Sequence, residues 1–141
     1  GRRLTLADEY STDDAEIILV TSGTAGYTAH VAVEEMRAAG LKVGNLRMRV
    51  FRPFPFDLVR RVLPKAKKVA VVDRNISYGH SGAFAQEVKS ALHGRADVPV
   101  FGFIAGLGGR DITPATFREI VDYTRSHDAP EEDIAWIGVK K

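Results

Sequence analysis

The run Ile17-Ile18-Leu19-Val20-Thr21, followed at once by Ser22-Gly23, decides the fold of this chain. The run is apolar almost throughout and does not alternate with polar residues, which is typical of a strand buried on both faces of a sheet. Ser22-Gly23 ends the strand, and the sequence after it changes to a helical period. A buried strand that leads directly into a helix is the repeating unit of layered α/β proteins.

The helix after this strand is predicted over residues 24–39, and Gly40 stands where a left-handed C-terminal cap is common. Its apolar face is formed, at spacing i, i+3, i+4, i+7, by Ala29, Ala32, Val33 and Met36. The same alternation of strand and helix continues to the end of the chain. Further strands are predicted over residues 42–50, 68–73 and 98–104, a short first strand over residues 4–8, and an edge strand in the tail over residues 134–139.

Three more helices separate these strands, and prolines and glycines mark their ends. One opens at Pro55 and stops before Pro64, a second follows Gly82, and the last has Thr113 as N-cap and Pro114 in its first turn. We find no internal repeat, low-complexity segment or linker. The sequence therefore predicts one α/β domain over residues 1–141, with a mostly parallel sheet.

Composition excludes several classes of protein. The 141 residues are 45% hydrophobic and 27% charged, which predicts a globular domain rather than a disordered chain. The absence of cysteine excludes a disulfide framework, a cysteine nucleophile and an iron–sulfur cluster held by these residues. A formal charge of +2, spread along the chain, predicts no nucleic-acid partner. No run is long enough to span a membrane, so we expect a cytoplasmic protein. The chain opens with Gly1 in place of methionine, which is expected of an excised or processed chain.

Parallel strands joined by helices place loops at the carboxyl edge of the sheet, where such folds usually bind ligands. The loops expected at that edge are residues 22–26, 52–55, 74–82 and 105–111. The first follows a strand and opens a helix, so its N–H groups offer an anion site. However, it lacks the three-glycine dinucleotide fingerprint and the Lys-Ser/Thr pair of a P-loop, which favours a tight turn.

The loop Gly106-Leu107-Gly108-Gly109-Arg110-Asp111 is the least ordinary of these segments. Its glycines and its Arg110–Asp111 pair are compatible with a backbone nest that binds an anion. Equally, the glycines serve a sharp turn, with Arg110 paired to Asp111 or to a loop carbonyl. Structure or an interdomain contact is the favoured interpretation, and a direct ligand contact is the alternative.

No catalytic or metal-binding set is predicted. None of the four histidines is spaced with another as a metal pair, and no HExxH motif is present. A Ser–His–Asp arrangement can be drawn from Asp73, His80 and the serines beside it, but the serines lie outside a G-x-S-x-G elbow. Phe51, Phe54 and Phe56 surround two prolines, and core packing is favoured for them over an exposed interface patch.

Several stretches, in order along nearly the whole chain, resemble the α chain of 2-oxoacid:ferredoxin oxidoreductases, particularly the pyruvate type. They are residues 9–16 (EYSTDDAE), 49–55 (RVFRPFP), 69–75 with Gly79, Gly82 and residues 87–89, and 106–113 (GLGGRDIT). The resemblance implies the second, C-terminal domain of that chain, with a fold like the transketolase C-terminal domain. That fold is a three-layer α/β/α sandwich on an about five-stranded mixed sheet with one antiparallel edge strand, here either the strand at residues 4–8 or the tail.

For the whole enzyme, the resemblance implies thiamine diphosphate, magnesium, iron–sulfur clusters, CoA and ferredoxin. The enzymes of this family convert a 2-oxoacid to an acyl-CoA and pass electrons to ferredoxin. The chain has no GDG-type thiamine motif, so no catalytic residue is carried over and the domain is expected to bind none of these cofactors. We expect a structural and assembly domain that contacts other domains or subunits. The alternatives are an anion- or CoA-contacting module, or the matching domain of a transketolase or a 2-oxoacid dehydrogenase E1β chain.

Three of the edge loops are therefore carried over only as surfaces for interface or anion contact. Their candidate residues are Arg52, Arg74, His80, Gly106, Gly108, Gly109, Arg110 and Asp111.

Overall fold

The buried strand that opened the sequence lies at the middle of the sheet. The computed structural model describes residues 5–77 and 79–139, and in it β2 (Ile17–Ser22) pairs in parallel with β3 (Val43–Met48) on one side and with β4 (Lys68–Asp73) on the other. Beyond β4 follow β5 (Val100–Ile104) and β6 (Ala135–Trp136), both parallel to their neighbours. The order across the sheet is β1-β3-β2-β4-β5-β6.

The antiparallel edge strand is the N-terminal one, and the tail is parallel. β1 (Ala7–Tyr10) pairs with β3 from Ala7 opposite Met48 to Tyr10 opposite Asn45. It begins later than the predicted strand at residues 4–8, because this pairing selects its register; Leu4 lies outside the described residues. The predicted tail strand shortens to β6, whose two residues pair with the end of β5. With β6 included the sheet has six strands, so the expected number of about five is too low by one.

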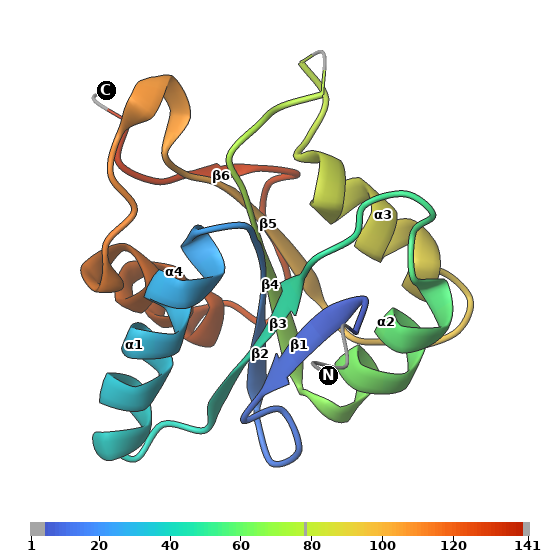
Figure 1. Ribbon diagram of the computed structural model, residues 1–141, viewed down its shortest axis with the longest axis horizontal. Helices are drawn as coiled ribbons and strands as arrows, with labels where there is room; N and C mark the ends of the chain where they lie inside the picture. Colours follow the sequence, from blue (N-terminus) through green and yellow to red (C-terminus); the bar gives the residue numbers. More distant parts are fainter. Residues whose placement is uncertain (1–4, 78, 140–141) are drawn as a thin grey trace.

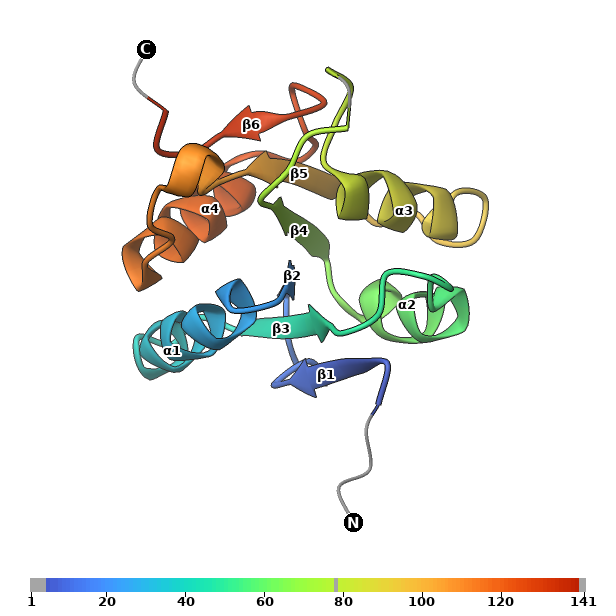
Figure 2. The ribbon, with the colours of Figure 1, turned by 45° about the horizontal axis from the view of Figure 1, so that its top comes forward.

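Four helices cover the two faces of the sheet and complete the three layers that were predicted (Figures 1 and 2). Helices α1 (Ala25–Ala38) and α4 (Pro114–Ser126) cover one face. Helices α2 (Phe56–Val62) and α3 (Ala83–Leu92) cover the other, and a 3₁₀ turn, η1 (Leu63–Lys65), follows α2. A second 3₁₀ turn, η2 (Leu107–Gly109), follows β5.

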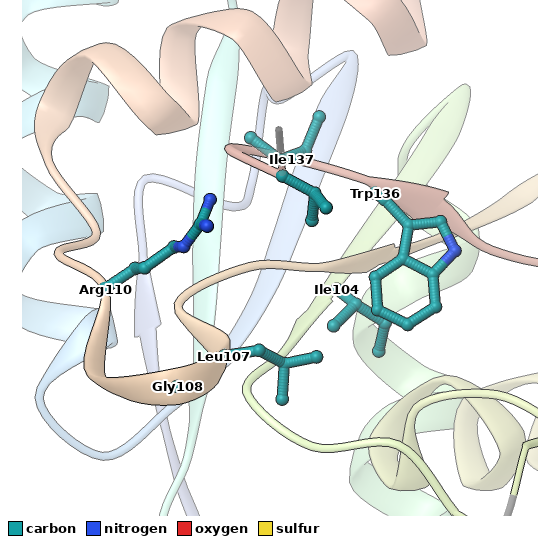
Figure 3. A pocket seen from close by; sticks show the side chains of 7 residues that line it. Ile104, Leu107, Gly108, Arg110, Trp136 and Ile137 are labelled. Atoms are coloured by element: carbon teal, nitrogen blue, oxygen red, sulfur yellow. The ribbon is translucent and has the colours of Figure 1, made fainter. Parts of the chain in front are cut away.

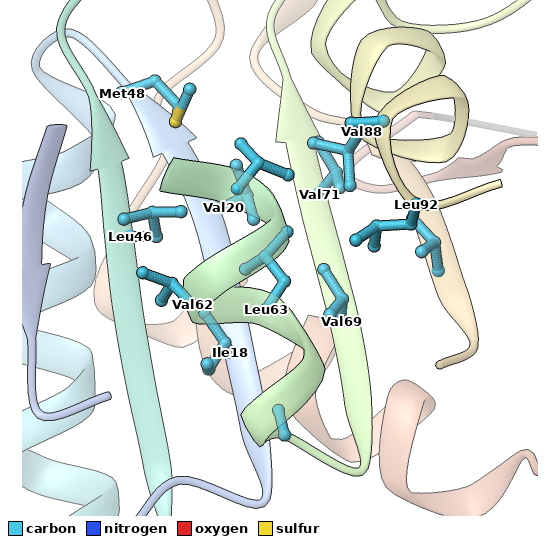
Figure 4. Packing of buried hydrophobic residues seen from close by; sticks show 14 of the residues in the cluster. Ile18, Val20, Leu46, Met48, Val62, Leu63, Val69, Val71, Val88 and Leu92 are labelled. Carbon is cyan, nitrogen blue, oxygen red and sulfur yellow. The ribbon is translucent and has the colours of Figure 1, made fainter. Parts of the chain in front are cut away.

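Alternating side chains of the central strands supply both hydrophobic cores. Ile18 and Val20 of β2 point to the face covered by α2, η1 and α3, and they share one cluster with Leu63 of η1 and Val88 of α3 (Figure 4). Ile17 and Leu19 point the other way, into the cluster that holds α1 and α4. Because parallel strands with helices on both faces are buried on both faces, β2 has no solvent side and reads as a continuous apolar run.

Local signals explain where the helices start and stop. Thr113 caps α4 by accepting a hydrogen bond from the Thr116 N–H at 3.3 Å, and Pro114 opens the helix as predicted. Gly40 has φ +87° after α1, the left-handed conformation expected of a C-terminal cap. Pro55 precedes α2 as its N-cap residue instead of opening it. In the part of the chain that is described, no helix has the length and apolar content needed to cross a membrane.

Candidate functional site

The carboxyl edge of the sheet gathers the loops that were predicted to lie there. The order of strands reverses at β2, since β3 lies on one side of it and β4 on the other. In open α/β sheets, ligands usually bind at such a switch point, outside the carboxyl ends of the strands. We therefore follow the edge loops in turn: residues 22–26 after β2, 49–55 after β3, 74–82 after β4 and 105–111 after β5 (Figure 1).

Asp73 ends β4 at the switch point and is 1% exposed. Its two carboxylate oxygens accept hydrogen bonds from the backbone N–H groups of Phe84 and Ala85, each at 3.0 Å. Asn75 accepts one more, from the Ala83 N–H at 3.2 Å. Burial raises the pKa of the Asp73 carboxyl, and the two N–H donors offset part of that rise. The first-turn donors of α3, which a phosphate would need, are thus already used inside the domain.

Gly82 is required by the same arrangement. A Cβ at this position would lie 2.1 Å from the Asp73 Oδ2 atom, so any side chain here would displace the carboxylate. Between these two residues, the loop 74–82 turns back on itself, with the Ser77 N–H donating to the Ser81 carbonyl at 2.8 Å. Tyr78 lies outside the described residues.

Two predicted site residues, Arg74 and His80, lie in this loop, and both are exposed. The His80 Nδ1 atom is 3.0 Å from the Gln86 amide nitrogen. Within the described residues no hydrogen bond joins Asp73 to His80, so Asp73 does not orient this histidine. The Ser–His–Asp arrangement drawn from the sequence is not formed here.

The loop after β2 is a tight turn, as favoured from its sequence. Gly23 has φ +58°, and the Tyr27 N–H donates to the Thr24 carbonyl at 3.0 Å. Gly26 has a different role, because a Cβ there would lie 2.1 Å from the Cδ atom of Arg47. The Arg47 side chain passes over this glycine and donates from Nε to Asp8 at 2.9 Å, which fixes β1 beside β3.

Arg52 follows β3 and reaches across to α3. Its Nη2 atom lies 2.6 Å from a carboxylate oxygen of Glu87, and its guanidinium stacks over the Phe51 ring at 4.0 Å from the centroid. Phe54 beside it is buried, whereas Phe51 and Phe56 are each 36% exposed. The three phenylalanines therefore divide between core packing and surface, where core packing had been favoured for all of them.

The glycine loop after β5 meets the tail of the chain. Gly106, Gly108 and Gly109 all have positive φ, at +73°, +67° and +78°, so the three glycines form a sharp turn. Arg110 donates through Nη1 to the Gly138 carbonyl, a partner in the tail rather than in its own loop. The neighbouring Asp111 is exposed.

A cleft opens between this loop and β6 (Figure 3). It is lined by Ile104, Leu107, Gly108, Arg110, Trp136, Ile137 and Val139. Its walls are largely apolar, with the Arg110 guanidinium on one side and the Trp136 indole on the other (Figure 3).

The predicted site residues share one edge but do not form one constellation. Arg52 contacts the helix that follows the 74–82 loop, whereas Arg110 contacts the tail. Within residues 5–77 and 79–139, no side-chain hydrogen bond or ion pair joins the 106–111 loop to the other two loops. Likewise, no group of three or more His, Asp or Glu side chains in these ranges is placed to hold a metal ion.

Two residues of this edge were not among the candidate site residues predicted from the sequence. Asp73 carries a signal that was available, since a carboxylate directly after an all-apolar strand must find partners when it is buried. Trp136 is the single tryptophan of the chain, in a tail that was predicted only as an edge strand. Its place in a cleft depends on the pairing of β6 with β5, which the sequence does not specify.

Comparison with known sequences agrees with the order of motifs. The family described as pyruvate:ferredoxin oxidoreductase core domain II matches residues 15–117. A pyruvate synthase subunit PorA of Methanothermobacter thermautotrophicus is 45% identical over the whole chain, and that of Thermotoga maritima is 34% identical. The chain covers only 35% and 36% of these two relatives, about a third of their length.

Two solved structures have the same fold at low sequence identity. A 2-oxoglutarate:ferredoxin oxidoreductase from Magnetococcus marinus matches with a TM-score of 0.64 and 18% identity, over 86% of this chain and 20% of that one. A split-gene transketolase, an inactive β4 tetramer, matches with a TM-score of 0.66 and 16% identity, over 89% of this chain and 42% of that one. At such identities the matches show the fold alone, and they confirm the transketolase-like sandwich.

Proposed function

The chain belongs to the pyruvate:ferredoxin oxidoreductase family as its core domain II, and from this premise we propose that it is a structural and assembly domain of a 2-oxoacid:ferredoxin oxidoreductase. The proposed substrate of the whole enzyme is pyruvate, which is supported by relatives described as pyruvate synthase subunits. The assembled enzyme would yield acyl-CoA, CO2 and reduced ferredoxin. Because the chain spans about a third of these relatives, we assign this activity to the assembly and not to the domain.

The observation that carries this proposal is that the first turn of α3, Arg52 and Arg110, all at the carboxyl edge, have their partners within the domain. The first-turn N–H groups of α3 bind Asp73 and Asn75, Arg52 pairs with Glu87, and Arg110 donates to Gly138. These donors do not fit a magnesium diphosphate, which needs free N–H groups and carboxylate ligands.

We accordingly place thiamine diphosphate, magnesium, the iron–sulfur clusters and CoA on other parts of the enzyme. The 141 residues contain no cysteine that could hold a cluster. The partners of the domain would be other domains or subunits, with ferredoxin meeting the whole enzyme. We propose no nucleic-acid partner and no membrane partner. We propose that the protein is located in the cytoplasm.

Turnover assays test the proposal directly. We expect the assembled enzyme to reduce ferredoxin when given pyruvate, CoA and thiamine diphosphate, and the isolated domain to show no pyruvate-dependent reduction. When the domain is deleted from its subunit, we expect that the enzyme either fails to assemble or loses this activity. Turnover by the isolated domain, or no pyruvate-dependent reduction by the assembled enzyme, would contradict the proposal.

A contact between residues 106–111 and an anionic group such as part of CoA is the less favoured alternative, because Arg110 is already bound to Gly138. Calorimetric titration of CoA into the assembled enzyme tests it. If Arg110→Ala leaves the affinity for CoA within about twofold, the alternative is wrong, since a direct charged hydrogen bond contributes about 1.5–3 kcal/mol. A loss of tenfold or more would support it.

A further inference from the structure

The exposed hydrophobic side chains of this domain are concentrated at one edge. In the described ranges, the large hydrophobic residues with substantial exposure are Leu6, Tyr27, Val31, Phe51, Phe56, Trp136 and Val139. All except Val31 lie at the carboxyl edge: on the segment that enters β1, in the loop after β3, in the first turns of α1 and α2, or at the end of β6. The opposite edge has none of them. Such clustering marks an interaction surface, whereas hydrophobic residues scattered singly would not.

One cluster surrounds the cleft of Figure 3. Trp136, 46% exposed, lies beside Ile104 and Leu107 (Figure 3). Val139, 50% exposed, also lines the cleft. The Arg110–Gly138 hydrogen bond holds the tail in place behind them, so the cleft is preformed. An indole beside an aliphatic floor is the kind of anchor point that dominates protein interfaces.

A second cluster lies at the other end of the same edge. Leu6, Phe54, Pro55, Phe56 and Leu58 line a shallow groove, with Arg61 at its rim. The Phe54 and Phe56 rings pack edge to face with centroids 5.2 Å apart. Leu6 lies beyond the carboxyl end of β3, because its carbonyl accepts from the Arg49 N–H at 3.0 Å.

The polypeptide itself joins the domain at these two clusters. The described chain runs into β1 through Leu6, in the second cluster, and leaves β6 through Val139, in the first. The relatives are about three times as long as this chain. In such a subunit the remaining polypeptide is covalently linked to this domain, which raises its effective concentration at the domain surface.

We propose that the two clusters, around Trp136 and around Phe56, form one docking face for the remaining polypeptide of the same subunit, the two thirds of the relatives' length that this chain does not cover. This inference rests on the proposed function as an assembly domain and names its partner. A preformed apolar cleft at each end of the edge gives two anchors and fixes the orientation of the docked part. Asp73 and Asn75, between the two clusters, are satisfied inside the domain and need no partner.

Cysteine accessibility in the full-length subunit tests the docking face. The variants Trp136→Cys and Phe56→Cys place a thiol in each cluster. Val31→Cys is the matched control, because Val31 is 48% exposed but lies along α1, away from the edge. The rate of maleimide labelling at each cysteine is measured by mass spectrometry of the peptide that contains it. This rate is divided by the labelling rate of the same cysteine in denaturant, which corrects for intrinsic reactivity. Circular dichroism verifies that each variant is folded.

In the full-length subunit without its partner subunits, we expect the two edge sites to label at least tenfold more slowly than the Val31→Cys site. A photo-crosslinker attached at Trp136→Cys should then capture a peptide from the uncovered part of the same chain. Equal labelling rates at edge and control would overturn the proposal. Protection that appears only when other subunits are added, or a cross-link to a second copy, would also overturn it. Pyruvate-dependent ferredoxin reduction is measured separately, so failure of the proposed function is distinguished from failure of the docking face.

Discussion

Asp73 ends β4 with its carboxylate buried, and both of its oxygens accept hydrogen bonds from the first turn of α3. One residue thereby ends the strand and accepts two N–H hydrogen bonds from the first turn of the next helix. Gly82 is tied to it, since only a residue without Cβ leaves room for the carboxylate. The first-turn N–H groups of α3 are therefore engaged by Asp73 and Asn75.

Replacing Asp73 with asparagine keeps the shape of the side chain but removes one acceptor. One of the two backbone N–H groups then faces an amide N–H, and we expect a loss of about 1–3 kcal/mol in the free energy of unfolding. Urea unfolding measures it. The control Asp97→Asn, on an exposed loop residue, should change the stability by less than about 0.5 kcal/mol. Equal effects of the two substitutions would contradict the role given to Asp73.

His30 is the other residue with an unusual environment. Its ring stacks on Tyr10 of β1 with centroids 4.3 Å apart, and its Nε2 atom is buried without a hydrogen-bond partner in the described structure. Burial, and after it the nearby Arg47 charge, lowers the pKa of His30 below 6.5. In the unfolded chain the same imidazole takes up a proton at about pH 6.5.

The unfolded state therefore binds more protons at this position, and the stability must fall as pH drops below about 6.5 until the lower folded pKa is passed. We expect this part of the pH dependence to disappear in His30→Phe, which keeps a stacked ring beside Tyr10. Thermal unfolding of both proteins between pH 7.5 and pH 5 gives the comparison. Parallel curves for the two proteins would show that His30 does not titrate in this way.

At the scale of elements, the tail strand β6 is the least secure part of the sheet. It has two residues, and the Ile137 N–H donates to the Ile104 carbonyl at 3.0 Å just beyond it. Apart from this pairing, the Arg110–Gly138 hydrogen bond holds the tail to the glycine loop. The cleft beside Trp136 exists only while this short element is docked.

Arg110→Ala should release the tail without unfolding the domain. A hydrogen bond from a charged group contributes about 1.5–3 kcal/mol, so the Ile137 amide should exchange its hydrogen roughly tenfold faster or more. The Val71 amide, in the central strand β4, serves as the internal reference and should keep its rate. Unchanged exchange at Ile137 would mean that the tail is held by its strand pairing and by the burial of Ile137 in the core.

For the whole molecule, two hydrophobic cores lie on opposite faces of one sheet and share its central strands. Leu63 is fully buried in one and Phe117 in the other. β2 and β4 contribute side chains to both cores. If one layer of helices detached, one face of these strands would be exposed to solvent while the other face stayed covered. The domain should therefore unfold as one cooperative unit.

Leu63→Ala and Phe117→Ala test this unity. Each should lower the free energy of unfolding by about 2–5 kcal/mol, through lost burial and a new cavity. Near-ultraviolet circular dichroism, which reports the packing of the aromatic rings, and far-ultraviolet circular dichroism should report the same single transition in both variants. Two separate transitions, or different midpoints for the two probes, would show that the layers unfold independently.

Burial and strand pairing also decide which parts of the fold can be predicted from the sequence. The strands at residues 17–22, 68–73 and 100–104 and the layers around them were predictable, because burial on both faces leaves an unbroken apolar run. The registers of β1 and β6 were not, since short edge strands are set by pairing with residues far along the chain. The edge loops were located correctly from topology. The partners of Asp73 and Arg110 were not predicted, because they depend on distances across the fold.

The two outer strands also bear on how the domain behaves in solution. Unpaired strand edges are templates on which other chains add strands and aggregate, and the danger grows with the length of the open edge. Here one border is a four-residue strand that carries Asp8 and Glu9, and the other is only two residues long. Neither offers a long row of free backbone groups to a neighbour. We therefore expect little aggregation of this sheet through its edges.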